Sequence, residues 1–293
     1  MLTVLRDFLG MIRFSHTIFA LPFALVSAVL AWQRTPFQWP QLAGIILCMV
    51  LARSAAMAFN RLVDRRFDAV NPRTAGRHLV TGRLSVSGVR LFAVVCGIGF
   101  IASTAMFLLN DPPNPWPLVL AVPVLVFICV YSLTKRFTRF AHFWLGASLM
   151  LVPVATWIAI RGMHDLLVPI IAGAAVFFWV SGFDVIYACQ DFDIDRSEKL
   201  HSIPARYGVP ESLRFALACH ILMLLILVVL GFAAPELGAI YFVGLTAIAA
   251  LVGYEHWLVR PDDLTRVNRA FFQANAAISL GFFAIVLIQV LAG

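Results

Sequence analysis

Long apolar segments recur along the whole chain, and this pattern constrains the fold more than any other feature. Each approaches or exceeds the roughly 20 residues that an α-helix needs to cross a bilayer. Charged residues make up only 13% of the chain, about half the usual share in a soluble domain. Irregular backbone is costly in hydrocarbon, so we expect an all-α polytopic membrane protein in which residues 1–293 form a single domain. The nine expected helices cover 11–32, 41–61, 86–109, 116–133, 141–160, 167–189, 212–233, 236–258 and 270–291.

The net charge of +7 predicts an orientation in the membrane. A basic chain can bind nucleic acid, but a membrane protein also needs Lys and Arg on its cytoplasmic side, and the apolar segments favour this second explanation. With the N-terminus inside, all but three of the 22 Lys and Arg residues lie at or beside cytoplasmic loops. The exceptions are Arg34 and Arg161, which fall outside, and Arg53, which lies within the second helix. We therefore expect a prokaryotic inner-membrane protein whose lipid contacts dominate, with Gly293 outside, and no nucleic-acid partner. The pattern indicates no protein partner.

Acidic residues gather at the cytoplasmic ends of two of the expected helices. The first cluster, Asn60-Arg-Leu-Val-Asp64-Arg-Arg-Phe-Asp68, places three polar groups four residues apart, along one helical face. The second runs from Asp184 to Asp195, and Asp184, Tyr187, Asp191 and Asp195 share a face there. Function is expected in these two regions, which hold about half of the 15 acidic residues of the chain.

The two clusters are related by a constant offset. Asp191 follows Asp64 by 127 positions, Asp195 follows Asp68 by the same interval, and so does Tyr187 after Asn60. Four expected helices separate equivalent points. This regularity predicts an internal duplication of a four-helix unit, followed by a ninth helix.

Carboxylates stacked on one helical face repel one another and are costly near lipid unless a cation neutralises them. Such groups suit Mg²⁺, which binds through one or two carboxylates together with substrate phosphates. Two such clusters would hold Mg²⁺ and a diphosphate. The alternative is that the acids merely end two solvated helices; the matched offset favours the metal site.

Basic residues follow each cluster. Arg73 and Arg77 come after the first and Lys199 after the second. Guanidinium forks and an ammonium group would add direct phosphate contacts and stabilise a departing anion. A cytoplasmic loop is basic in any case, which explains part of this pattern.

The chain resembles the UbiA superfamily of intramembrane prenyltransferases along nearly its whole length. The resemblance rests on the N-x-x-x-D-x-x-x-D cluster followed by R-T-x-x-R, and on D-x-x-Y-x-x-x-D-x-x-x-D. It implies a helical bundle around a central polar cavity open to the cytoplasm, where Mg²⁺ and a polyprenyl diphosphate bind. It implies that the ligands surrounding the metals are Asn60, Asp64, Asp68, Asp191 and Asp195. Lys135 and Arg136 match a third basic patch of that superfamily and are expected to contact diphosphate.

Within the superfamily, the motifs are most similar to the 4-hydroxybenzoate polyprenyltransferases and to a relative in the futalosine route to menaquinone. That likeness implies an aromatic acid as acceptor, either 4-hydroxybenzoate or a dihydroxynaphthoate, in respiratory quinone biosynthesis. Gln190 departs from the more acidic pattern of the ubiquinone branch and leaves the acceptor open. The alternatives are another acceptor, such as haem or a chlorophyll precursor, and an ion-coupled transporter. A transporter predicts charges near the bilayer midplane, whereas these acids cluster at one face.

Substitution of an aromatic ring by an allylic cation needs no protein nucleophile, so the work expected of the protein is electrostatic. Catalytic roles are assigned to three residues. Tyr187 is expected to face the cation, Asp191 to take the ring proton or polarise the acceptor, and Lys199 to stabilise diphosphate. The alternative for Tyr187 is packing at a helix interface. Arg53 lies two helical turns deeper than Asn60 on the same face, and its fork matches a carboxylate. We assign Arg53 and Asp184 to acceptor binding; the alternative for Arg53 is a structural pair with Asp184 or with a helix carbonyl.

Overall fold

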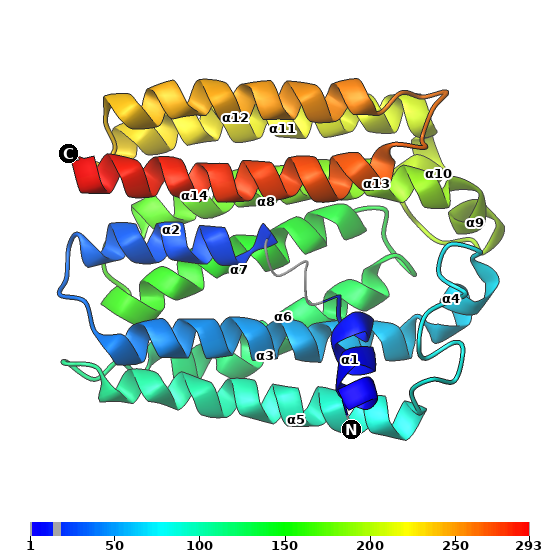
Figure 1. The fold of residues 1–293 in the computed structure, drawn as a ribbon, viewed down its shortest axis with the longest axis horizontal. Helices are drawn as coiled ribbons and strands as arrows, with labels where there is room; N and C mark the ends of the chain where they lie inside the picture. Colours follow the sequence, from blue (N-terminus) through cyan, green and yellow to red (C-terminus); the bar gives the residue numbers. More distant parts are fainter. Residues whose placement is uncertain (1, 14–18, 293) are drawn as a thin grey trace. The chain divides into compact units, whose positions relative to one another are not determined.

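The computed structural model describes residues 2–13 and 19–292 and is helical, as expected (Figure 1). Within these residues the only extended pairing is an isolated bridge between Arg260 and Asp263. Eight of the described helices are long and apolar enough to cross a membrane. The chain divides into two compact units, residues 1–17 with 38–134 and residues 18–37 with 135–293.

The first unit is built around one long helix, α3, which packs against both α5 and α6. The polar side chains of the first cluster lie at the end of α3 and in the short helix that follows it. Its elements are α1 (Leu2–Met11), α3 (Trp39–Val63), α4 (Arg65–Val70), α5 (Val86–Thr104), the 3₁₀ turn η2 (Ala105–Leu109) and α6 (Trp116–Thr134).

The second unit is built around α8, which packs between α7 and α11 and is the most buried of the eight spanning helices. Helix α2 packs against α7 and α14, and α14 also lies beside α12 (Figure 1). The elements are α2 (Leu21–Trp32), α7 (Ala141–Arg161), α8 (Leu167–Ala188), η3 (Cys189–Asp191), α9 (Phe192–Ser197), α10 (Ile203–Tyr207), α11 (Val209–Ala233), α12 (Ala239–Leu258), α13 (Val267–Arg269), the π-helical η4 (Ala270–Ala274) and α14 (Asn275–Ala292).

Local sequence explains where several helices begin. The hydroxyl of Ser85 accepts a hydrogen bond from the backbone N–H of Gly88 at the start of α5, and Ser202 does the same for Ala205 at the start of α10. Proline has no backbone N–H, so it is favoured in the first turn of a helix, where that group has no partner within the helix. It occurs in the first turn of α2, α3, α10 and α11.

The structure corrects the first of the nine expected helices. The expected span 11–32 is replaced by α1, which ends at Met11, and by α2, which begins at Leu21 beside Pro22. Residues 14–18 of that expectation lie outside the described residues. Helix α2 has only 12 residues, so by length it does not cross a bilayer alone. The other eight expected helices are all present.

The structure also interrupts the helical face expected for each acidic cluster, just beyond the expected helices 41–61 and 167–189. Helix α3 ends at Val63 and α4 starts at Arg65, with Asp64 between them. Helix α8 ends at Ala188, the turn η3 follows, and α9 begins after Asp191. Aspartate is a poor interior helix residue because its side chain competes for backbone hydrogen bonds, which explains breaks at these positions.

Candidate active site

The first cluster is joined by short hydrogen bonds. The Asn60 amide donates to Asp64 Oδ2 at 2.7 Å, and its Oδ1 accepts from Arg61 at 3.0 Å. Asp68, 6% exposed, pairs with Arg77 at 2.5 Å and lies 3.9 Å from Arg61. The spacing of four therefore does bring Asn60 and Asp64 together, and two guanidinium groups balance the buried carboxylate of Asp68.

A tight turn places Arg73 and Arg77 after the cluster. The side chain of Asn71 accepts from the backbone N–H of Arg73 at 2.9 Å, and the Thr74 hydroxyl donates to the carbonyl of Asp68 at 3.0 Å. These bonds anchor the loop to the end of α4. A guanidinium has five N–H donors, so Arg77 can hold Asp68 and still donate to a phosphate oxygen.

In the second unit, Asp184 pairs with a residue from another helix. His142 of α7 is fully buried, and its Nδ1 lies 2.7 Å from Asp184 Oδ2. Its Nε2 accepts from the backbone N–H of Ile203 at 3.4 Å, which leaves the proton on Nδ1 to donate to the carboxylate. Asp184, predicted to bind the acceptor, thus has one oxygen committed to His142.

Lys135 is the cation of the second cluster. It directly follows α6, and its Nζ lies 3.4 Å from Asp195 Oδ2. Burial would lower the pKa of Lys135, but the carboxylates of Asp195, Asp184 and Asp191 outweigh that effect, and the pKa is raised. The ammonium group is therefore positively charged at neutral pH, as its predicted role at a diphosphate requires.

Tyr187 lies one turn before Asp191, as the spacing predicts. Its ring packs against Phe271 of η4 with the centroids 4.3 Å apart. Asp191 itself is 7% exposed. An aromatic pair therefore lies on the membrane side of this carboxylate, within the second unit.

Lys199 follows the C-cap residue of α9 and has a backbone conformation that is usually adopted by glycine. Its φ is 54°, and the amide of Leu200 donates to the carbonyl of Asp195 at 2.8 Å while that of Lys199 donates to Arg196 at 3.3 Å. This pair of bonds is a Schellman motif, in which a left-handed residue closes the helix. A lysine is kept there although a side chain in this region costs about 1–2 kcal/mol.

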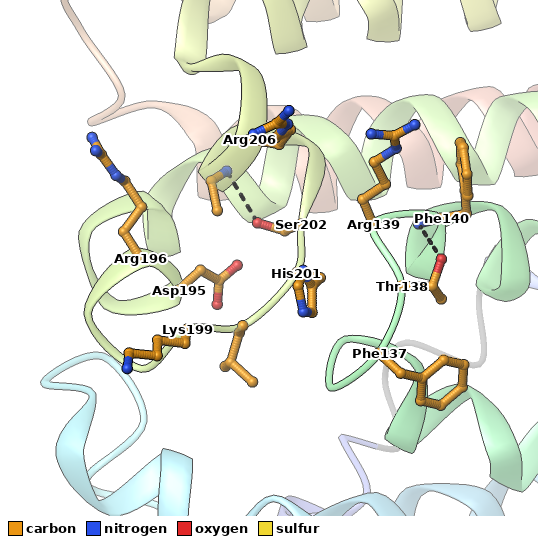
Figure 2. Close-up of a pocket in the computed structure, with 12 residues that line it drawn as sticks. Phe137, Thr138, Arg139, Phe140, Asp195, Arg196, Lys199, His201, Ser202 and Arg206 are labelled. Carbon is orange, nitrogen blue, oxygen red and sulfur yellow. Dashed lines mark hydrogen bonds between the residues drawn. The ribbon is translucent and has the colours of Figure 1, made fainter.

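A cavity of about 620 Å³ opens beside Lys199 in the second unit (Figure 2). Asp195 is the one carboxylate among its lining residues. The cavity's basic side chains are Arg139, Arg196, Lys199, His201 and Arg206. Phe137 and Phe140 form its apolar side. Such an excess of positive charge suits a polyanion.

Arg53 of α3 is half-buried, and its Nη2 donates a hydrogen bond to the backbone carbonyl of Arg13 at 3.4 Å. Its Nε is buried without a hydrogen-bond partner. Part of the guanidinium is therefore committed to the main chain at Arg13, beyond the end of α1, and part is left with an unmet donor. Arg136, expected to contact diphosphate, is exposed beside Lys135.

Sequence reasoning missed three residues that the structure brings into these clusters. His142 is 42 positions from Asp184, and no local pattern connects them. Arg61 lies inside the first motif, but its burial against Asn60 was not expected. Arg139 follows the Lys135-Arg136 pair by one turn, and that spacing is a signal that can be recognised in the sequence.

In both units, apolar spanning helices lead into carboxylates that pair with basic side chains, Asp68 with Arg77 and Asp195 with Lys135. The UbiA prenyltransferase family model matches residues 20–284. The chain belongs to this family and is a prenyltransferase, which confirms the expected fold class and resemblance.

Curated relatives match most of the chain. The 4-hydroxybenzoate octaprenyltransferase of Alkalilimnicola ehrlichii is 30% identical over 248 residues, covering 84% of this chain and 81% of the relative. That of Methylobacillus flagellatus is 31% identical over 262 residues, covering 86% and 84%. Among solved structures, a UbiA homologue from Aeropyrum pernix K1 in its apo form has a TM-score of 0.82 and 32% identity, and covers 94% of this chain and 98% of its own. A UbiA homologue from Archaeoglobus fulgidus bound to GPP and Mg²⁺ shares the fold, with a TM-score of 0.70 at 18% identity over 97% and 99% of the two chains.

Proposed function

We propose that this enzyme transfers a polyprenyl group from its diphosphate to a small aromatic acid, 4-hydroxybenzoate or a dihydroxynaphthoate, in respiratory quinone biosynthesis. The observation that carries the proposal is the repeated cluster in which a buried carboxylate lies beside a cation, Asp68 with Arg77 and Asp195 with Lys135. The curated relatives named 4-hydroxybenzoate octaprenyltransferase support the acceptor class. We further propose that residues 1–293 act as one catalytic domain, since the family model includes both compact units.

Oxygen donors in both clusters fit Mg²⁺. Among the described residues, no three His, Cys, Asp or Glu side chains converge closely enough to hold a metal by themselves. Mg²⁺ typically binds through one or two carboxylates, with waters and phosphates completing the shell, and such a donor set needs no all-protein cage. The proposed ligands are Asn60, Asp64, Asp68, Asp191 and Asp195. When bound, Mg²⁺ would neutralise charge on the diphosphate as the C–O bond breaks. The Archaeoglobus homologue solved with GPP and Mg²⁺ supports this assignment.

The chain's own bases complete the charge balance. Arg73, Arg77, Lys135, Arg136 and Lys199 are proposed to donate to the diphosphate oxygens and to stabilise the leaving group. The basic cavity of the second unit favours this role for Lys199, because the anion would enter a region with a strong positive field.

Four residues are proposed to act on the organic partners. The ring of Tyr187, packed against Phe271, would face the allylic carbon and exclude water from it. Asp191 would take the proton that the aromatic ring loses after the new C–C bond forms. Arg53, with a buried donor to spare, and Asp184 are proposed to hold the acceptor's polar groups.

Product analysis tests the proposal. Purified protein in lipid vesicles is given Mg²⁺, geranyl diphosphate or a longer polyprenyl diphosphate, and a panel of aromatic acids. Mass spectrometry should find an acid whose mass has grown by one prenyl group, with release of diphosphate. Prenylation of haem or a chlorophyll precursor with no prenylated acid would overturn the acceptor assignment, and no transfer to any acceptor would overturn the proposal as a whole.

The active face is proposed to lie on the cytoplasmic side of the inner membrane. The basic partition along the chain motivates this orientation. Arg34 and Arg161, the two residues assigned to the outside, contact each other: Arg161 donates to the carbonyl of Arg34 at 2.9 Å. Their shared location agrees with a common external face.

A further inference from the structure

Five polar side chains meet inside the second unit, and the catalytic proposal uses none of them. They come from four membrane helices that pack together, and His220, Glu255 and Asn275 are completely buried. Polar and ionisable groups at membrane depth are costly and usually serve a function. The set is Trp179 of α8, His220 of α11, Glu255 and His256 of α12, and Asn275 of α14.

Asn275 is the centre of this network. The indole N–H of Trp179 donates to Asn275 Oδ1 at 2.7 Å, and Asn275 Nδ2 donates to Glu255 Oε1 at 2.7 Å. The partners fix which way the amide points, because Trp179 can only donate and the carboxylate oxygen accepts. Three helices are thereby joined through one side chain.

Burial of the Glu255 carboxylate costs free energy, because one of its oxygens lacks a hydrogen bond. Its Oε2 is buried and has no hydrogen-bond partner among the described residues, and His220 Nδ1 lies 3.8 Å away from it. His220 is already engaged, since its Nε2 lies 3.2 Å from the carbonyl of Trp179 and its Nδ1 lies 2.9 Å from His256 Nε2. Gly182 allows the His220 ring to pack directly against α8, because a Cβ at position 182 would lie 2.5 Å from that ring. A buried carboxylate with a single good partner needs a reason to be there.

Asn275 also holds an unusual stretch of backbone. The five residues before it, Ala270–Ala274, form a π-helical turn, a feature that often occurs at functional sites. Asn275 Nδ2 lies 3.3 Å from the carbonyl of Ala270 and 3.2 Å from that of Phe271, so it binds carbonyls that the wide turn presents. The amide therefore stabilises this turn from within.

Phe271, inside the π turn, is the residue that packs on Tyr187. Its ring also meets Phe183 edge-on, with centroids 5.4 Å apart, and Phe183 in turn meets Trp179 at 5.0 Å. Trp179 thus supports Phe271 twice, through the aromatic contacts and through Asn275 (the positions of α8 and α14 are shown in Figure 1). Displacing the turn would displace the aromatic wall beside Tyr187.

We propose that the hydrogen-bond chain Trp179–Asn275–Glu255 is a positioning device for prenyl transfer, which locks the π turn so that Phe271 holds Tyr187 beside Asp191 and keeps water from the reacting carbon. Asn275 and Glu255 are positioning residues in this scheme, since they act through Phe271. The inference rests on the proposed function. It deepens that proposal by assigning a water-exclusion role to a region outside the carboxylate clusters.

The measurable consequence is a change in product ratio. When the allylic C–O bond breaks, attack by the aromatic ring gives the prenylated acid, diphosphate and a proton, whereas attack by water gives prenyl alcohol, diphosphate and a proton. The ratio of prenyl alcohol to prenylated acid reports how well water is excluded. It does not depend on how much of the enzyme is folded, so a variant of low yield remains informative.

The experiment measures this ratio with geranyl diphosphate, Mg²⁺ and the aromatic acid that the wild type accepts. Asn275→Leu and Glu255→Leu should each raise it by at least about tenfold, because small misplacements at a reacting centre have large effects. Glu255→Gln should stay within about twofold of wild type, because a glutamine amide oxygen still accepts from Asn275. Gln289→Leu is the matched control: Gln289 also joins α14 to α12, accepting from the Tyr241 N–H at 3.1 Å, but at the other end of the helix.

The outcomes separate the two proposals. A wild-type enzyme that prenylates no aromatic acid contradicts the proposed function itself. A wild type that does so, together with an unchanged ratio in Asn275→Leu, contradicts only the positioning role. A shift in Gln289→Leu as large as that in Asn275→Leu also contradicts it, because any loosening of α14 would then suffice.

Discussion

Asp64 and Asp191 have nearly the same backbone conformation, at equivalent positions in their two clusters. Asp64 has φ −91° and ψ 1°, and Asp191 has φ −101° and ψ 11°. Both fall in the sparsely allowed bridge region, where active-site residues are often found. Each ends a membrane helix segment and starts a six-residue helix, α4 or α9, and the bounds of these short helices differ by the same 127 positions. The duplication predicted from the sequence therefore extends to local geometry.

Loss of either aspartate should abolish turnover. Asp64→Ala or Asp191→Ala removes a proposed metal ligand and should lower kcat by about 10²–10³-fold or more, because charge stabilisation of the leaving group is lost. Activity should require added Mg²⁺ or Mn²⁺ and be measured as prenylated product with and without chelator. Asp193→Ala is the control, since Asp193 is exposed and lies between the two ligands Asp191 and Asp195 without sharing their face. Full activity in excess chelator would refute the metal assignment.

Two substitutions of Lys199 distinguish the role of its charge in catalysis from the effect of its left-handed backbone conformation on stability. Lys199→Gly and Lys199→Ala both remove the ammonium group and should both slow prenyl transfer. Glycine relieves the left-handed φ of 54°, so Lys199→Gly should be the more stable of the two by about 1 kcal/mol in thermal unfolding. Wild-type activity in Lys199→Ala would show that the ammonium group has no role at the diphosphate.

Arg53→Ala should affect the acceptor more than the diphosphate. Loss of one desolvated charged contact is expected to cost about 2–4 kcal/mol in kcat/KM for the aromatic acid. Arg53→Lys should restore only part of this, since an ammonium group cannot reproduce a two-pronged contact. Unchanged acceptor kinetics in a folded Arg53→Ala protein would leave its bond to the Arg13 carbonyl as its role.

The loops outside the spans carry a pH-sensitive ion pair. Arg34 binds Glu236 through Nε at 2.6 Å and NH2 at 3.0 Å. Burial alone would raise the pKa of Glu236, but the Arg34 hydrogen bond and the charges of Arg34 and Arg161 bring the net pKa below its ordinary value of 4.5. A lowered pKa means that the unfolded chain binds the proton more readily, so the pair stabilises fully above pH 4.5 and loses its effect as the pH falls through the lowered pKa.

Glu236→Gln should therefore lower the free energy of unfolding by about 1–3 kcal/mol at pH 7, and by progressively less in acid. The measurement is thermal unfolding in detergent across pH. Glu211→Gln is the control: Glu211 pairs with Arg214, but their side chains are 56% and 76% exposed, and such pairs contribute little. An equal loss in both variants would contradict a special role for Arg34.

Topology can be tested with reporter fusions. A reporter placed after Arg73 or Lys199 should be active in the cytoplasm, and one placed after Gly293 should be active outside, because the basic residues follow that partition. The experiment also tests whether α2, at 12 residues, completes a crossing. Arg73 and Gly293 on the same side would contradict nine crossings.

Hydropathy and spacing predicted the helices and the carboxylate clusters because both depend on local rules. Apolar length fixes a membrane helix, and a four-residue interval fixes a helical face. The breaks at Asp64 and Asp191 were not predicted, because a four-residue spacing of polar side chains is the same whether the helix is continuous or interrupted by a short turn. Contacts between distant segments could not be predicted for a different reason. The contacts of His142 with Asp184 and of Glu255 with Asn275 depend on which helices pack together, and no short sequence pattern encodes that packing.

The π turn at Ala270–Ala274 contains one residue more than a regular α-helical turn would need, and this extra residue sets the register of the helix around it. A hydrogen bond between residues five apart encloses one more residue than the four-residue interval of an α-helix. Deleting Gln273 would leave a length that suits regular α-helix, in which each residue turns by about 100°. Phe271 would then point away from Tyr187 while every aromatic and polar side chain of the network was still present. Under the proposed function, the register of this helix would therefore help to determine which side chains border the reacting carbon.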